Sequence, residues 1–175
     1  MAMGMATTVL RLAPLLLTTS SLNFSYNQYL FLDPFLHLPP SHQSTTNQTL
    51  RRYVHRQFPS GLVAILALYP LTWATAIINL TSGSRLLPHI APLDVIPRRW
   101  YTAGLLFNAG HMLWAPKAKG LMQEIGGLGE YADRPRIGEK DERDEVGLLK
   151  EWLGLHVWRS VLADFPGWVV SGWGF

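Results

Sequence analysis

The feature that most limits how this chain can fold is an uninterrupted run of uncharged residues from position 57 to position 84. The run is apolar over about the twenty residues that an α-helix needs to cross the hydrocarbon core of a bilayer. Pro70 removes one backbone donor and is expected to kink this helix, which neighbouring helices in a membrane tolerate. The polar residues near its end share one side and are expected to face other helices: Thr72, Thr75 and Asn79.

Three other stretches have a similar composition. Residues 12–32 contain no formal charge, residues 100–116 are uncharged, and the C-terminal stretch is apolar with few ionisable groups. The expected spans are residues 10–32, 60–80, 99–116 and 147–172, and the expected loops are residues 33–59, 81–98 and 117–146. Four apolar helices joined by polar loops predict an all-α fold, an integral membrane bundle of about four transmembrane helices, as a single membrane domain over residues 1–175.

The first span has a second interpretation. Arg11 followed by a short apolar run is also the pattern of a cleaved signal peptide. We favour an uncleaved span, because no small-x-small cleavage site follows and the apolar character returns at residues 29–32. The basic residues of the expected loops do not fix which side of the membrane the chain ends face.

Two asparagines in the first third of the chain have candidate roles. Asn27 shares a helix face with Asn23 and Tyr26, where it is expected to reach a substrate pocket or to bond a neighbouring helix. Asn47 begins the sequence Asn-Gln-Thr, a glycosylation sequon in the expected loop 33–59. This sequon predicts a glycan only if that loop is lumenal.

The overall composition excludes several classes of site. The chain has no cysteine, so disulfides, thiolate nucleophiles and cysteine-ligated metals are excluded. Its six histidines form no His-x3-His or Glu-x2-His pair, and we predict no metal site on one helix. The net charge is +3 and 48% of the residues are hydrophobic. Since no basic stripe with interleaved aromatics is present, the predicted partner is the lipid bilayer and not nucleic acid.

The C-terminal apolar stretch carries three ionisable groups, which are costly at membrane depth and usually have a use there. His156 and Arg159 are three residues apart and share a helix face, with Trp152 one turn earlier. Asp164 follows Arg159 by five residues and would point elsewhere on an ideal helix. Because the residue before a proline is disfavoured in helical dihedrals, Pro166 predicts a local break that turns Asp164 toward Arg159.

Residues 99–116 offer a matching face, since Asn108 and His111 lie on a row of small and polar side chains. Three interpretations compete. The polar groups hold helices together through a buried ion pair, they form a catalytic pocket for proton transfer and anion stabilisation, or they serve transport. Transport by alternating access requires one group of transmembrane helices to move against another, and four short spans are few for this, which disfavours transport.

The ending Trp152-x3-His156-x2-Arg159-Ser160-x3-Asp164-x-Pro166-Gly167-Trp168 resembles the last helix of small fungal membrane tailoring proteins. These are the anthrone-oxygenase-like family and the small membrane epoxidases and epoxide hydrolases of secondary-metabolite clusters. The motif covers the last 25 residues, and the span layout extends the resemblance to the rest. Asparagine is usual in that family where this chain has His156.

The resemblance implies a tailoring enzyme in the endoplasmic reticulum or another internal membrane, with a lipophilic, polyketide-type substrate and other pathway enzymes as further partners. We expect oxygenation or epoxidation without a cofactor. His156 would act as the base, Arg159 as the anion stabiliser and Asp164 as the orienting acid, and the expected pocket wall is Asn108, His111, Trp152 and Asn27. The alternatives are an epoxide hydrolase or ring-opening cyclase, in which Asp164 activates water, and a non-catalytic scaffold subunit.

Overall fold

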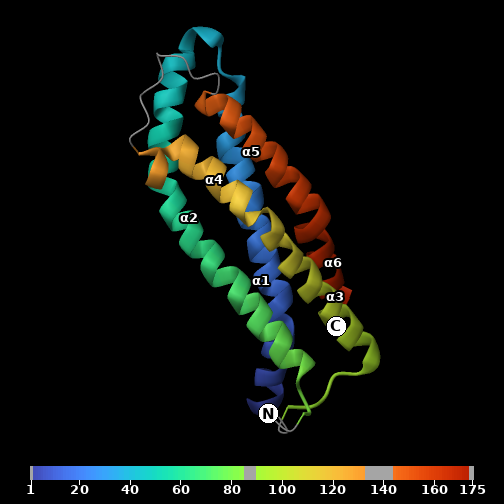
Figure 1. Cartoon of the computed structure of the whole chain (residues 1–175). Helices are drawn as coiled ribbons and strands as arrows, with labels where there is room; N and C mark the ends of the chain where they lie inside the picture. Colours follow the sequence, from blue (N-terminus) through green and yellow to red (C-terminus); the bar gives the residue numbers. More distant parts are fainter. Residues whose placement is uncertain (1, 85–89, 133–143, 174–175) are drawn as a thin grey trace. The chain divides into compact units, whose positions relative to one another are not determined.

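The computed structural model describes residues 2–84, 90–132 and 144–173. These residues are almost entirely helical and include no β-strand, so the all-α class predicted from the sequence is confirmed. The α-helices are α1 (Ala2–Leu32), α2 (Gln43–Leu80), α3 (Val95–His111), α4 (Ala115–Gly126), α5 (Glu145–Arg159) and α6 (Phe165–Trp173) (Figure 1). The 3-10 helices are η1 (Asp33–His37), η2 (Pro40–His42), η3 (Met112–Trp114) and η4 (Gly129–Tyr131), and η5 (Ser160–Asp164) is a π-helix.

The chain divides into two compact units. The first contains Met1–Phe24, Ile65–Leu113 and Arg159–Phe175, and the second contains Ser25–Ala64 and Trp114–Trp158. The two longest helices, α1 and α2, contribute one end to each unit. Each unit is therefore a small bundle of helical segments drawn from distant parts of the sequence.

In the first unit, α3 and α6 lie side by side (Figure 1). Their close approach depends on glycine, because a Cβ atom on Gly104 would lie 2.9 Å from Ser171 Oγ, and one on Gly167 would lie 3.1 Å from Asn108 Nδ2. Asn108 Nδ2 donates to the carbonyl of Gly104 at 3.0 Å. Ser171 Oγ donates to the carbonyl of Gly167 at 2.7 Å. The small and polar face predicted for residues 99–116 is thus a helix-packing face.

The first unit is polar inside and apolar outside. Its buried polar residues include Thr18, Ser21, Thr72, Asn79, Asn108, His111, Arg159, Asp164 and Ser171. Its exposed large apolar residues include Leu16, Leu66, Leu71, Ile77, Leu106, Val161, Leu162, Phe165 and Trp173. Helices that face lipid show this arrangement, because lipid solvates apolar side chains and polar groups must find partners within the bundle.

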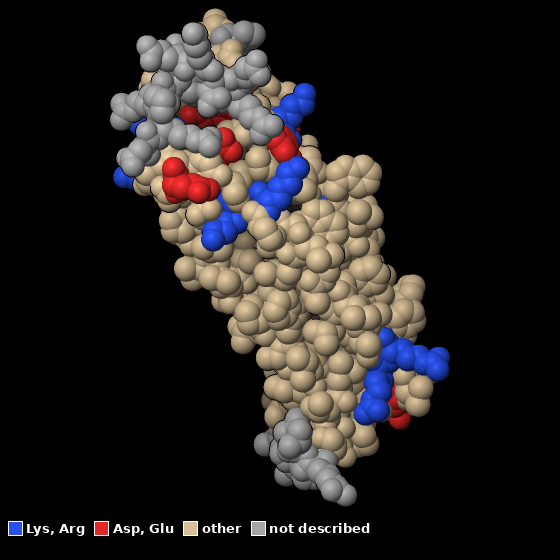
Figure 2. Space-filling view, viewed as in Figure 1, with Lys and Arg blue, Asp and Glu red and all other residues tan. Residues whose placement is uncertain are grey.

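Two helices of the structure are long and apolar enough to cross a membrane, over Gly4–His37 and Gln43–Leu80. They contain the first two spans expected from the sequence. The charged side chains of α3 gather at its beginning, at Arg98 and Arg99. Beyond this cluster, uncharged residues cover the surface over α3 and α6 on the face shown in Figure 2.

The second unit has an ordinary hydrophobic core. Its buried apolar residues are Leu32, Leu50, Val54, Leu121, Met122, Ile125, Leu148, Leu149, Trp152 and Leu153. They come from the end of α1, the beginning of α2, α4 and α5. α4 is capped by Gly127, which follows its last residue and whose φ of 58° lies in the left-handed region that glycine adopts without strain.

Two expected loops were partly wrong. Residues 43–59 were expected in a loop but form the first turns of α2, because Leu50 and Val54, four residues apart, pack into the core of the second unit. Residues 117–126 were expected in a loop but lie in α4, where Leu121 and Ile125 do the same. The expected loop sequon was also misplaced, since Asn47 lies within α2 and is 5% exposed.

Candidate functional site

A carboxylate and an imidazole meet inside the first unit. Asp164 ends η5 and His111 ends α3, and Asp164 Oδ1 lies 2.6 Å from His111 Nδ1. Both side chains are 4% exposed. When Nδ1 carries the proton it donates to the carboxylate, and Nε2 then carries the lone pair that can accept a proton. The pair is therefore able to act as a base.

Arg159 faces the other oxygen of the same carboxylate. Its Nε lies 3.4 Å from Asp164 Oδ2, and Ser160 Oγ donates to that oxygen at 3.4 Å. The approach requires the π-helical turn, in which Phe165 N–H bonds the carbonyl of Ser160, five residues earlier. Pro166 follows directly and has no N–H to continue the regular ladder. The predicted turn of Asp164 toward Arg159 is confirmed, but its predicted cause is wrong. Phe165, before the proline, keeps helical dihedrals (φ −67°, ψ −49°), and the π-helical turn brings the carboxylate round.

Tyr69 on α2 completes the site, and the sequence analysis missed it. Its hydroxyl lies 2.7 Å from His111 Nδ1 and 3.2 Å from Asp164 Oδ1, and it accepts a hydrogen bond from Ser21 Oγ at 3.0 Å. The rings of Tyr69 and His111 pack with centroids 4.1 Å apart. We call this group the polar cluster; its members are Ser21, Tyr69, His111, Arg159, Ser160 and Asp164.

A signal for Tyr69 was present in the sequence. Thr72 and Asn79 were predicted to lie on the inward side of their helix, and Tyr69 lies three residues before Thr72, one turn earlier on the same side. All three are buried in the structure. Extending the polar row backward by one turn would have found the tyrosine.

The charges within the polar cluster balance. Four groups surround the Asp164 carboxylate: His111 and Tyr69 lie at Oδ1, and Arg159 and Ser160 lie at Oδ2. A buried ion is tolerated when an opposite charge and further hydrogen bonds compensate for its lost hydration. The arrangement can therefore hold a proton acceptor and a cationic group together in an apolar environment.

Of the other site residues predicted from the sequence, Asn108 lies one turn before His111 on α3. Its amide donates to Gly104 within the packing face with α6. The structure brings Asp164, Arg159 and His111 together, whereas Asn108 lies on the face of α3 that packs against Gly167 of α6.

His156 and Trp152 belong to the second unit. The His156 ring stacks on Trp152 with centroids 4.5 Å apart, and its Nε2 lies 3.0 Å from the carbonyl of Ser25. Asn27 is half-buried near the end of α1, in the same unit. These residues form a group of their own, with Trp152 inside the apolar core.

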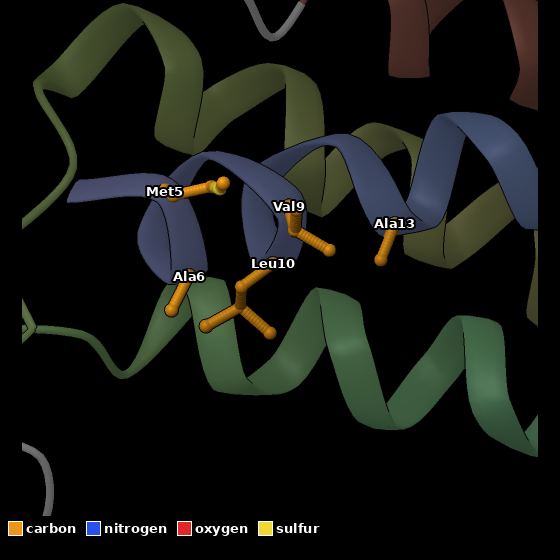
Figure 3. Close-up of a pocket in the computed structure, with 5 residues that line it drawn as sticks. All are labelled: Met5, Ala6, Val9, Leu10 and Ala13. Atoms are coloured by element: carbon orange, nitrogen blue, oxygen red, sulfur yellow. The ribbon is translucent and has the colours of Figure 1, made fainter. Parts of the chain in front are cut away.

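A metal centre and a surface hollow are two further kinds of site at which a ligand could bind. Among residues 2–84, 90–132 and 144–173, no three His, Asp or Glu side chains come together as metal ligands. A shallow apolar hollow lies on the first turns of α1, between Met5 and Ala13 (Figure 3). Ala13 precedes Ser21 by eight residues, or roughly 12 Å along a helix. The hollow is therefore separate from the polar cluster.

Comparisons with known proteins point to epoxidation. The chain is 24% identical to "Epoxidase pydX" of Acremonium sp, over 92% of this chain and 88% of the relative. It is 26% identical to "Epoxidase gkaX" of Penicillium citrinum, over 97% of this chain and 94% of the relative. It is 25% identical to "Oxaleimides biosynthesis cluster protein N" of Penicillium oxalicum, over 97% of this chain and 89% of the relative. No protein-family model matches the chain, and no solved structure gives a significant match. These relatives support an epoxidase-type enzyme.

Proposed function

We propose that this protein is a membrane-embedded epoxidase-type tailoring enzyme that acts on a lipophilic, polyketide-type intermediate of secondary metabolism. The observation that carries the proposal is the contact of 2.6 Å between Asp164 Oδ1 and His111 Nδ1, with Arg159 at the second carboxylate oxygen. This acid–base group lies inside a unit whose outer surface is apolar. A lipophilic substrate dissolved in a bilayer would reach such a unit without passing through water.

The roles follow from the contacts. His111, held by Asp164 through Nδ1, removes a proton from an acidic O–H or C–H of the substrate through Nε2. Arg159 stabilises the resulting oxyanion, because a fixed cation in a water-poor site is worth more than in water. The sequence predicted His156 as the base. We now assign this role to His111, because His156 is buried in the second unit, stacked on Trp152.

The oxidant is dioxygen. Epoxidation places one oxygen atom in the product and releases the other as water, which consumes two electrons and two protons. We propose that the substrate supplies both, as a hydroquinone-type diol that is oxidised to the quinone level while one of its double bonds is epoxidised. The deprotonated substrate is electron-rich, and no separate cofactor is needed in this scheme.

The experiment that tests the proposal uses the protein in microsomes or lipid vesicles with candidate substrates and labelled oxygen. Label from dioxygen gas in the epoxide, formed without added reductant, is the expected result. Asp164→Asn should lower the rate by about 10²-fold or more, the usual range for acid–base catalysis. The matched control is Asp94→Asn, since Asp94 is exposed before α3 and its side chain makes no cap hydrogen bond. Product formation by Asp164→Asn at the wild-type rate would refute the assigned site.

Two histidine variants decide which imidazole is the base. His111→Gln should abolish turnover with normal protein abundance, and His156→Gln should act only through substrate affinity or stability. The opposite result would return the base to His156, as the sequence analysis expected.

Epoxide opening is the second candidate function, and the Asp164–His111 pair also favours it. A histidine oriented by a carboxylate can activate water, and Arg159 can then polarise the epoxide oxygen. In that case the label enters the product from water and none comes from dioxygen. A scaffold subunit, the third alternative, predicts that Asp164→Asn lowers protein abundance and product formation in parallel.

A further inference from the structure

A shallow hollow lies on the exposed face of α3, outside the polar cluster. It is lined by Val95, Arg98, Arg99, Thr102, Ala103 and Leu106. Both arginines are exposed, and Val95 and Leu106 are each 67% exposed. Figure 2 shows the basic side chains gathered over the beginning of α3. We call this feature the basic hollow, because it joins two cations to an apolar surface on one helix.

Little negative charge opposes these cations. The sequence of the first unit contains two acids, Asp94 and Asp164. Asp164 is buried in the polar cluster. Asp94 is exposed one residue before α3, and within the part of the chain that the structure describes no ion pair joins it to Arg98 or Arg99. The basic hollow therefore keeps a local excess of positive charge.

The arginines have N–H groups left to donate. Arg98 Nη2 donates to the carbonyl of Leu80 at 3.3 Å, and its other N–H groups remain. Among residues 2–84, 90–132 and 144–173, no hydrogen bond or ion pair holds the Arg99 side chain. Thr102 Oγ1 donates its hydrogen to the carbonyl of Arg98 at 2.9 Å. The two guanidinium groups are thus the recognition groups, and their planar arrays of donors match the oxygens of a phosphate.

The apolar part of the basic hollow favours an amphiphile over a soluble anion. Leu106 lies seven residues after Arg99, which is roughly 10 Å along a helix. One leaflet has a hydrocarbon layer of about 15 Å, half that of the bilayer. A lipid with its headgroup at Arg99 therefore places an acyl chain at the depth of Leu106. A zwitterionic headgroup would bring its own cation toward the arginines, so a lipid with a net negative charge fits better.

We propose that the basic hollow binds an anionic phospholipid, with its phosphate at Arg98 and Arg99 and an acyl chain along Ala103 and Leu106. Basic side chains at a membrane surface are attracted to such lipids. The bound lipid holds the beginning of α3, the helix that carries His111, at the level of the headgroups. The inference shares with the proposed function only the membrane location, and it needs no substrate.

The test is native mass spectrometry of the full chain in a neutral detergent, which counts bound lipids directly. The protein is titrated with phosphatidylglycerol or with phosphatidylcholine of the same acyl chains. The variant is Arg98→Gln/Arg99→Gln. The matched control is Arg52→Gln/Arg56→Gln, which removes the same charge from two exposed arginines of α2 that belong to the second unit.

We expect the wild type to bind phosphatidylglycerol about tenfold or more tightly than phosphatidylcholine. One cation near an anionic lipid surface is worth roughly a fivefold change in affinity, so the double variant should lose roughly 25-fold and the control should bind like the wild type. If the double variant does not fold, Arg99→Gln alone replaces it and should lose about fivefold. Equal binding of the two lipids, an unchanged affinity in the variant, or an equal loss in the control would overturn the proposal.

Competition separates a phospholipid site from simpler anion sites. Inorganic phosphate has similar oxygens without chains, and oleate has one chain and a carboxylate. Neither should displace phosphatidylglycerol at the concentration that saturates lipid binding. Displacement by phosphate would reduce the basic hollow to an anion site, displacement by oleate would make it a fatty-acid site, and either result would overturn the phospholipid assignment. Selective lipid binding by a protein that turns over no substrate would support this inference while the proposed function failed.

Discussion

Arg159 and Asp164 are five residues apart in one helical stretch, and Arg159 Nε nevertheless lies 3.4 Å from Asp164 Oδ2. An α-helix turns through 3.6 residues and would place a residue five positions later on a different side. The π-helical turn of Ser160–Asp164 widens the helix and returns Asp164 to the side of Arg159. The ion pair of the candidate site thus depends on a local irregularity of the backbone.

The first prediction concerns the shape of the cation. Arg159→Lys keeps the charge but replaces the planar group whose Nε faces Asp164 by a flexible ammonium. We expect product formation to fall about tenfold to a hundredfold, with protein abundance near that of the wild type. The measurement is product per mole of protein in microsomes, with abundance from immunoblotting.

The control for this prediction is Arg99→Lys, since Arg99 is exposed at the beginning of α3. It should leave the rate unchanged. A parallel loss of abundance and product in Arg159→Lys would instead mean that the arginine only holds helices together.

The sequence predicted an irregularity near Asp164 from Pro166, but not its form, a π-turn in which Phe165 keeps helical dihedrals. Two other features were not foreseeable in the same way. The helical turns before residue 57 are rich in polar residues, and few of their positions, among them Leu50, Tyr53 and Val54, pack against the core of the second unit. Tyr69 was read as part of an apolar run, since an aromatic residue in such a span has no local feature that marks a hydrogen-bonding role. Its partners come from α1, α3 and η5, and long-range contacts of this kind are fixed by packing.

The second prediction concerns the packing of α3 on α6. Gly104→Ala places a Cβ atom 2.9 Å from Ser171 Oγ, whose hydroxyl already bonds the carbonyl of Gly167. We expect a loss of stability of about 1–3 kcal/mol, the usual cost of overpacking. Gly110→Ala on the same helix has nothing within 4 Å and should be neutral or stabilising, by up to about 1 kcal/mol. Thermal unfolding in detergent measures both, and equal effects would contradict the packing described here.

The third prediction tests whether the exposed apolar surface of the first unit faces lipid. Leu106 lies on α3 and is 67% exposed, so Leu106→Arg would be harmless in water. In a bilayer the arginine should cost about 2.5–3.5 kcal/mol near the centre of a span and lower the membrane-integrated fraction. Val95→Arg is the matched control, because Val95 is also 67% exposed but begins α3, close to Arg98. Carbonate extraction of microsomes gives the membrane-integrated fraction. An unchanged fraction for Leu106→Arg would argue against the insertion of α3 in the bilayer.

The fourth prediction concerns pH and the second unit. Glu145 begins α5, is 5% exposed, and its Oε1 lies 3.6 Å from Arg51 Nη1. Burial raises the pKa of Glu145 above its ordinary value, and Arg51 only partly opposes the shift. A raised folded-state pKa means that folding favours the protonated acid. Its contribution to stability is therefore complete below the ordinary carboxyl value of about 4.3 and is lost as the pH rises through the folded-state pKa.

We therefore expect the unfolding temperature of the detergent-solubilised protein to fall as the pH rises through this window. Glu145→Gln, which stays neutral, should flatten that part of the profile. Glu151→Gln is the matched control, since Glu151 is exposed on the same helix, with Oε1 2.9 Å from Lys117 Nζ, and it should keep the wild-type profile. A profile for Glu145→Gln that has the wild-type slope would show that the buried carboxyl group does not control the stability of the second unit.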